Sequence, residues 1–185
     1  MQETTPGIRH WTAVHPNIGW TVSSYWLPDL KVLLDPLDVP DEVDDIEHIV
    51  MSNRHHTRSC AEASDRFGAT IHGPGGEPYE FGEPFIDGAI TAYQVTELWP
   101  DDSALHIPAL DTLAIADTVL RNEDGELAWM PDYCFHDAAA ERASIKTGLG
   151  RLTDELAFSH LLLAHGDPIA NSGREDLAAF AKGGS

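Results

Sequence analysis

The sequence is poor in positively charged residues. It holds 11 lysines and arginines against 31 aspartates and glutamates, which gives a formal net charge of −20 at pH 7. A surface of this charge repels a phosphate backbone, so general binding to nucleic acid is excluded. Only three of the cations are lysines, while 18 of the acids are aspartates. This balance keeps a protein dissolved at high salt, and it is equally typical of an acidic composition without that role.

Cysteines and long hydrophobic runs are scarce as well. Cys60 and Cys134 are too few for the disulfide framework of a small secreted domain, and the first ten residues lack the features of a secretory signal. The longest apolar runs, HLLLAH and TLAIA, are far shorter than a membrane span. We therefore expect a cytoplasmic protein with no membrane partner, folded as one domain, 1–185.

The first half of the chain predicts a set of strands and one helix. Short β-type runs bounded by proline, glycine or aspartate indicate strands at 10–16, 19–27, 31–36, 48–52 and 69–74. Cys60, Ala63 and Phe67 recur at helical spacing, and Gly68 supplies a stop signal. The run 48–74 therefore reads as a strand, a polar loop, a helix over 58–67 and another strand.

The second half predicts a second, antiparallel sheet and two helices. A glycine- and proline-rich loop over 75–90 holds at most one short hairpin. The expected strands are 89–98, 103–109, 111–120, 125–131 and 160–167. Apolar spacing predicts helices over 137–156 and 174–182, the first of them bent near Gly148 and Gly150.

Polar clusters follow three of the expected buried strands. They are the run 53–58, Asp117 after LAIA, and the run 165–167 after LLLA. Buried strand ends are costly places for ionisable groups that have no role, and scaffolds commonly place reactive side chains there. The clusters together predict a functional site where these strand ends meet.

The order of these segments resembles the metallo-β-lactamase fold superfamily. The similar segments are KVLLDP, HIVMSNRHHTRSCAEASDRFGA, LAIADTVL and LLLAHGDPI. The resemblance implies an α+β fold, a four-layer αββα sandwich with a core from about residue 8 to residue 180. It places the site at one edge, between the two sheets. Asp35 of KVLLDP, before Pro36, is expected to be a turn residue, and the resemblance offers it a supporting role at the site as an alternative.

Most of the family's metal ligands are replaced in this sequence. On the family's His-x-His-x-Asp-His motif the chain has Asn53, His55, Thr57 and Arg58, a version that resembles a divergent branch with the motif SNRHH-x-R. The family's mid-chain histidine falls near Trp99, where no histidine occurs. A site with two metal ions, each with about three protein ligands, is therefore not expected.

The resemblance leaves His55, Asp117 and His165 as metal ligands, with His56 or Asn53 assisting. Two histidines and one carboxylate suit a single zinc or ferrous ion with open coordination positions. We expect such an ion to be weakly held. A protein with no metal fits the sequence equally well.

Arg58 places a permanent cation where the family has a metal ligand. A guanidinium pairs well with carboxylates, so Arg58 is expected to pair with Asp117, directly or through one water, and to act with it in catalysis. Together with Arg54 it forms a positive pocket, and Asn53 and His56 add polar contacts for a small anionic ligand. In the alternative, both arginines are solvated or pair with the acidic run 38–47.

Two functions fit this site. One is a hydrolase with a reduced metal site, at most one ion, that acts on a small anionic ester, thioester or phosphoester. The other is a metal-free, non-catalytic binding or regulatory module that holds a small anion through Arg58, His55 and His165.

Overall fold

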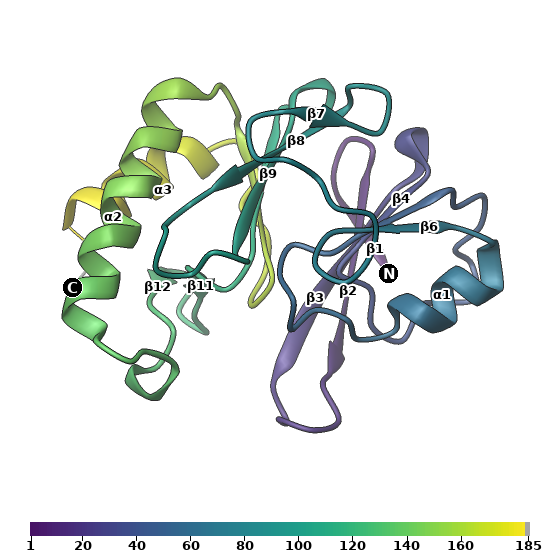
Figure 1. Ribbon diagram of the computed structural model, residues 1–185, viewed down its shortest axis with the longest axis horizontal. Helices are drawn as coiled ribbons and strands as arrows, with labels where there is room; N and C mark the ends of the chain where they lie inside the picture. Colours follow the sequence, from purple (N-terminus) through teal and green to yellow (C-terminus); the bar gives the residue numbers. More distant parts are fainter. Residues whose placement is uncertain (184–185) are drawn as a thin grey trace.

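The computed structural model describes residues 1–183, in which two β-sheets lie face to face between helices (Figure 1). Residues 184 and 185 of the predicted domain lie outside the described residues. The first sheet has the strand order β1 (Gln2–Thr5), β2 (Ile8–Val14), β3 (Thr21–Leu27), β4 (Val32–Leu34), β5 (His48–Val50) and β6 (Thr70–His72).

The second sheet and the helices come mainly from the later part of the chain. Its strand order is β13 (His160–Leu163), β10 (Thr112–Ile115), β9 (Ser103–Ile107), β8 (Ile90–Gln94) and β7 (Pro84–Phe85). A separate ribbon pairs β11 (Leu120–Arg121) with β12 (Leu127–Ala128). The helices are α1 (Cys60–Phe67), α2 (Ala138–Glu155) and α3 (Gly173–Gly183), with 3-10 turns η1 (Pro28–Leu30), η2 (Pro108–Leu110) and η3 (Asp132–Cys134).

An apolar core fills each space between neighbouring layers. Cys60 and Ala63 of α1 pack on the outer face of the first sheet, with Ile49. Leu27 and Leu105 belong to the core between the two sheets. The core between the second sheet and helices α2 and α3 includes buried residues from both, among them Leu113, Leu161, Ile145 and Leu177. The prediction of an α+β fold with four αββα layers is confirmed.

Parallel strands and bonds between the sheets bring several strand ends together. Strands β4, β5 and β6 run parallel to one another, as do β10 and β13. The Tyr25 hydroxyl of β3 bonds both the carbonyl and the N–H of Leu163, at 2.7 and 3.1 Å. The N–H of Ser23 donates to the carbonyl of Ala164 at 2.9 Å. These bonds hold the carboxyl end of β13 against the first sheet.

The structure differs from the sequence expectations in a few elements. Strand β1 was not expected, because its sequence QETT is polar, yet it pairs antiparallel with β2. The second sheet is not wholly antiparallel, because β13 joins β10 in parallel. The expected strand over 125–131 lies outside that sheet, in the β11–β12 ribbon. Gly148 permits close packing of α2, since a Cβ there would lie 1.7 Å from the Val95 carbonyl oxygen.

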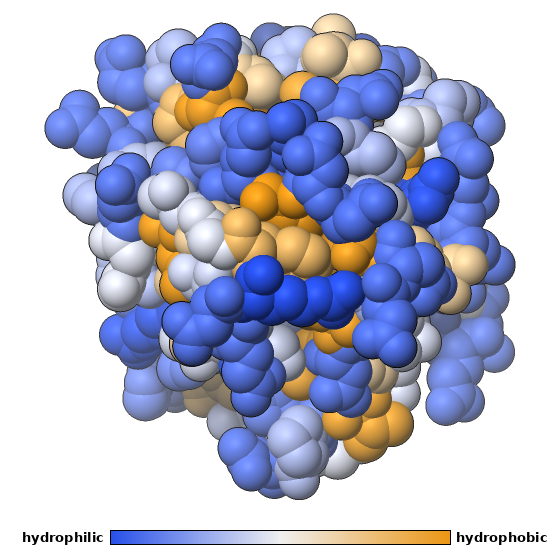
Figure 2. Space-filling view, turned by 90° about the vertical axis from the view of Figure 1, so that its right-hand side faces the viewer, coloured by the Kyte–Doolittle hydropathy of each residue, from blue (hydrophilic) through white to orange (hydrophobic). Residues whose placement is uncertain are grey.

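The surface is largely hydrophilic on the side of α1 and β6. Figure 2 shows this side covered mostly by hydrophilic residues, with hydrophobic residues near its centre and smaller groups of them at the upper left and lower right. Among residues 1–183, no helix is both long enough and apolar enough to cross a membrane.

Candidate metal centre

The candidate site lies where four strands end. Asp35 follows β4, the loop 51–59 follows β5, Asp117 comes two residues after β10, and His165 comes two residues after β13. The carboxyl ends of β4 and β5 lie at one edge of the first sheet, because these strands are parallel, and β10 and β13 share an edge of the second sheet for the same reason.

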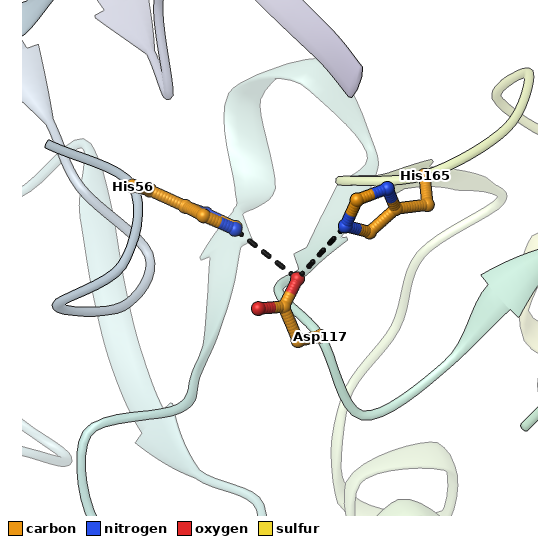
Figure 3. A group of neighbouring side chains, drawn as sticks. All are labelled: His56, Asp117 and His165. Atoms are coloured by element: carbon orange, nitrogen blue, oxygen red, sulfur yellow. Dashed lines mark hydrogen bonds and ion pairs between the residues drawn. The ribbon is translucent and has the colours of Figure 1, made fainter. Parts of the chain in front are cut away.

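Two histidines converge on the carboxylate of Asp117. His56 Nε2 lies 3.1 Å and His165 Nε2 lies 3.3 Å from the same oxygen, Asp117 Oδ1, and the two rings approach from different sides (Figure 3). One ligand atom from each of the three residues lies within 4.8 Å of the other two. This is a two-histidine, one-carboxylate group of the kind that binds divalent transition metals.

The second nitrogen of each ring, Nδ1, has a partner of its own outside the group. His56 Nδ1 donates to Asp35 Oδ2 at 2.9 Å, and the Ser52 hydroxyl also donates to that oxygen. Asp35 has a left-handed backbone with φ 47°, a conformation that aspartate tolerates better than most residues. His165 Nδ1 donates to the Thr21 carbonyl oxygen at 3.3 Å. Partners of this kind fix ring orientation and leave both Nε2 atoms facing Asp117.

Burial and neighbouring charges shift the pKa values of these groups. Burial alone would lower the pKa of His56, but the carboxylates of Asp35 and Asp117 outweigh it and raise the pKa to about 9. Burial would raise the pKa of Asp117, whereas His56 and His165 hold it well below the usual value. Without a metal, His56 is therefore an imidazolium between two carboxylates.

The other side of Asp117 is chemically different. Asn53 Nδ2 donates to Asp117 Oδ2 at 2.8 Å and to Asp102 Oδ1 at 3.2 Å. Burial and the nearby charge of Asp117 raise the pKa of Asp102 to about 7. Asp102 Oδ2 is buried and has no hydrogen-bond partner among residues 1–183. On this side the Asn53 amide and a second carboxyl group, Asp102, lie beside Asp117.

The predicted loop residues lie in unlike positions. His56 is buried and joins Asp117 and His165, whereas His55 is exposed and is not part of this group. The structure thus groups His56, and not His55, with Asp117 and His165. Arg54 is exposed and pairs with Asp101 at 3.0 Å.

Arg58 makes no direct ion pair with Asp117, so the expectation of a direct pair is corrected. Its Nη1 donates to the backbone carbonyls of Ser23 at 2.9 Å and Asp35 at 2.8 Å. These bonds join β3 and the residue after β4 to the loop after β5. Asp117 needs no arginine, since His56 already supplies the compensating charge.

Sequence reasoning gave Asp35 a role only through the family resemblance, and it assigned none to Asp102. The signal for Asp35 was an aspartate at the end of an apolar strand, where a buried carboxylate needs donors. Asp102 lies in the acidic turn WPDD, and no feature of that turn distinguishes buried Asp102 from the less buried Asp101.

Two clefts meet at Asp117. The first, of about 370 Å³, is bordered by Asn53, Trp99, Asp101 and Asp102. The second, of about 630 Å³, has the cationic or titratable side chains His15, Arg58 and His165 together with apolar ones. Asp117, His55, Met130 and Cys134 line both clefts. A small molecule in the second cleft would therefore reach all three of His56, Asp117 and His165, whereas one in the first would reach only Asp117.

Comparison with solved structures identifies the fold. The chain matches the metallo-β-lactamase DIM-1 with a TM-score of 0.68 and 12% sequence identity, covering 100% of this chain and 97% of that one. A metallo-β-lactamase family protein from Thermus thermophilus gives 0.60 and 15%, covering 97% and 81%. Rubredoxin oxygen:oxidoreductase from Desulfovibrio gigas gives 0.62 and 12%, covering 98% and 61%.

The chain thus has the metallo-β-lactamase fold. No protein-family model and no curated protein sequence matches it. Sequence identities of 12 to 15% carry the fold and not the activity, because one fold supports many reactions.

Proposed function

We propose that the chain is a hydrolase with a single, weakly held divalent metal ion, bound by His56, Asp117 and His165. The observation that carries the proposal is the convergence of both Nε2 atoms on one oxygen of Asp117, while both Nδ1 atoms are occupied by partners outside the group. The donor set fits zinc or ferrous iron. Such an ion polarises an ester or phosphoryl group and lowers the pKa of water.

The residues around the group orient the ligands and bind the substrate. Asp35 and Thr21 hold the rings of His56 and His165 in place. Asn53 holds Asp117 from the other side. We propose a small anionic ester, thioester or phosphoester as substrate, with its anionic part in the second cleft near Arg58 and His15. Asp101 and Asp102 make the first cleft a poorer place for that charge.

The proposal is tested by metal content and hydrolysis together. Protein purified without chelators is analysed for zinc, iron and manganese, and chromogenic esters, thioesters and phosphodiesters are offered after metal supplementation. We expect up to one ion per chain and hydrolysis that Asp117→Asn abolishes. His106→Ala, which changes a histidine on β9 that lines neither cleft, is the matched control and keeps both. Hydrolysis that persists in Asp117→Asn, or hydrolysis of none of the three classes at full metal loading, would contradict the proposal.

A second function is favoured by the charge balance of the group itself. The His56–Asp117 contact of 3.1 Å neutralises a buried carboxylate without any metal. A metal-free binding module would then hold a small anion in the second cleft beside Arg58 and His165. Calorimetric binding of phosphate or a dicarboxylate to chelator-treated protein, with no metal bound after supplementation, would favour this function over the first.

A further inference from the structure

A second pair of histidines lies away from this group, on neighbouring strands of the first sheet. His48 Nδ1 and His72 Nε2 are 3.0 Å apart, and their ring centroids are separated by 5.1 Å. In the parallel pairing of β5 and β6, His48 lies opposite Thr70, and His72 lies opposite Val50. Because side chains alternate along a strand, both histidines lie on the same face of the sheet.

This face is the one that packs against the second sheet. Val50 belongs to the core between the sheets, and the His72 ring lies 5.8 Å from that of Phe85 in β7. Both histidines are half-buried. Within residues 1–183 neither ring makes another hydrogen bond. The two rings are therefore held by regular strands on a fixed backbone, with one nitrogen of each facing the other.

We propose that His48 and His72 form a separate binding site for a divalent transition-metal ion of the Cu²⁺ or Ni²⁺ type. Two nitrogens that each lie about 2.1 Å from one ion at a right angle are about 3.0 Å apart. The observed separation of 3.0 Å matches this spacing. Imidazole nitrogens suit these ions, and water completes the coordination.

The surroundings favour a cation at this pair. The backbone of Glu77 forms an isolated parallel β-bridge with that of His72, so an acidic residue lies next to the pair. The formal net charge of −20 attracts cations to the molecule as a whole. A bound ion would cross-link β5 to β6 and stabilise the native state by mass action.

The test uses Cu²⁺ as the probe and removes the other candidate centre. The variant His165→Gln is titrated with Cu²⁺ by calorimetry, alone and combined with His72→Gln or with His106→Gln. His106 is the matched control, a half-buried histidine on β9. We expect one Cu²⁺ per chain, an affinity at least about tenfold weaker with His72→Gln, and no change with His106→Gln. Electron paramagnetic resonance should show coordination by two imidazole nitrogens.

Equal Cu²⁺ affinity with and without His72→Gln, or a spectrum without two imidazole nitrogens, would overturn the proposal and leave the pair a hydrogen bond between rings. A measurement on the unmodified chain covers the case in which His165→Gln does not fold. Because Phe85 lies beside His72, Cu²⁺ should broaden the Phe85 ring signals in the NMR spectrum. Phe85 signals that stay sharp when Cu²⁺ has saturated the protein would also overturn it.

Discussion

The two oxygens of Asp117 face regions of opposite chemistry. Oδ1 contacts the ring nitrogens of His56 and His165, at 3.1 and 3.3 Å. Oδ2 accepts a hydrogen bond from Asn53, whose amide also donates to Asp102. An imidazole nitrogen with a free lone pair binds a metal, whereas an amide N–H group donates a hydrogen bond and does not. One side of the shared carboxylate therefore carries two ring nitrogens that could hold a metal, whereas the other side is occupied by hydrogen bonds.

The largest effect is expected from removing one of the two histidines that contact Asp117 Oδ1. His165→Ala removes one of three ligands, so zinc affinity should fall by more than about 100-fold, beyond the usual loss from an outer partner. His55→Ala, in the loop after β5, is the matched control. It should change zinc affinity little, because His55 is exposed and outside the group. Competition with a chromogenic zinc chelator measures both. A similar loss in the two variants would contradict the assignment.

The second prediction concerns stability of the metal-free protein against pH. The pKa of His56 is raised to about 9 in the folded chain from an ordinary value of 6.5, so folding favours its protonated form. Its contribution is complete below pH 6.5 and is lost as the pH rises through about 9. We expect a loss of roughly 3 kcal/mol in unfolding free energy over this window.

Urea unfolding at pH 6.5 and pH 9, in the presence of a chelator, measures this loss. The raised pKa of Asp102, about 7, acts in the same direction over the lower part of the window. His56→Gln should remove most of the dependence above pH 7. Unchanged pH dependence in that variant would show that His56 is not the titrating group.

A third prediction addresses the partner behind His56. Asp35→Asn keeps the shape of the side chain but removes the charge that accepts from His56 Nδ1. Zinc affinity should fall by about 10- to 100-fold, as for other outer partners of metal-binding histidines. Asp38→Asn, an exposed change in the same connection, serves as the control. An affinity equal to that of the unchanged chain would mean that Asp35 does not orient the ring.

Only part of the fold and of the site could be predicted from the sequence. The ends of two strands, near Asp117 and His165, could be predicted. A buried strand is a continuous run of apolar residues, so the first polar residue after the run marks its end. The family resemblance predicted the four layers. Helix α1 and the strands β2 to β5 lie close to their predicted positions. Strand β1 could not be predicted, because its polar sequence at the edge of the sheet has no run of apolar residues.

Residue-level contacts in the loop after β5 could not be predicted. His55 and His56 are chemically identical neighbours, and only the backbone path of the loop decides which of them is buried. The same path turns Arg58, with φ 29°, toward the carbonyls of Ser23 and Asp35 instead of Asp117. Such choices depend on contacts distant in sequence, which spacing alone does not encode.

A fourth prediction sharpens the account of Arg58. Arg58→Gln removes charged donors to two carbonyls, so the unfolding free energy should fall by about 2 kcal/mol. In a double-mutant cycle with Asp117→Ala the losses should add to within about 0.5 kcal/mol, because the two side chains make no direct contact. Recovery of stability in the double variant would restore the expected Arg58–Asp117 pair.

The smallest effect is expected at the rim. Arg54 and Asp101 form an exposed ion pair at 3.0 Å, and such pairs contribute about 0.5 kcal/mol or less. Arg54→Ala should leave the thermal unfolding midpoint almost unchanged. A decrease larger than that of Arg58→Gln would mean that the rim, and not the buried network, organises the loop.

The most direct test of the central claim is anomalous X-ray scattering at the zinc absorption edge from crystals grown with zinc. The account predicts one peak in the cleft, within coordination distance of His56 Nε2, Asp117 and His165 Nε2, and none beside Asn53 and Asp102. A peak on the Asn53 side, or no peak between the two histidines at saturating zinc, would contradict it.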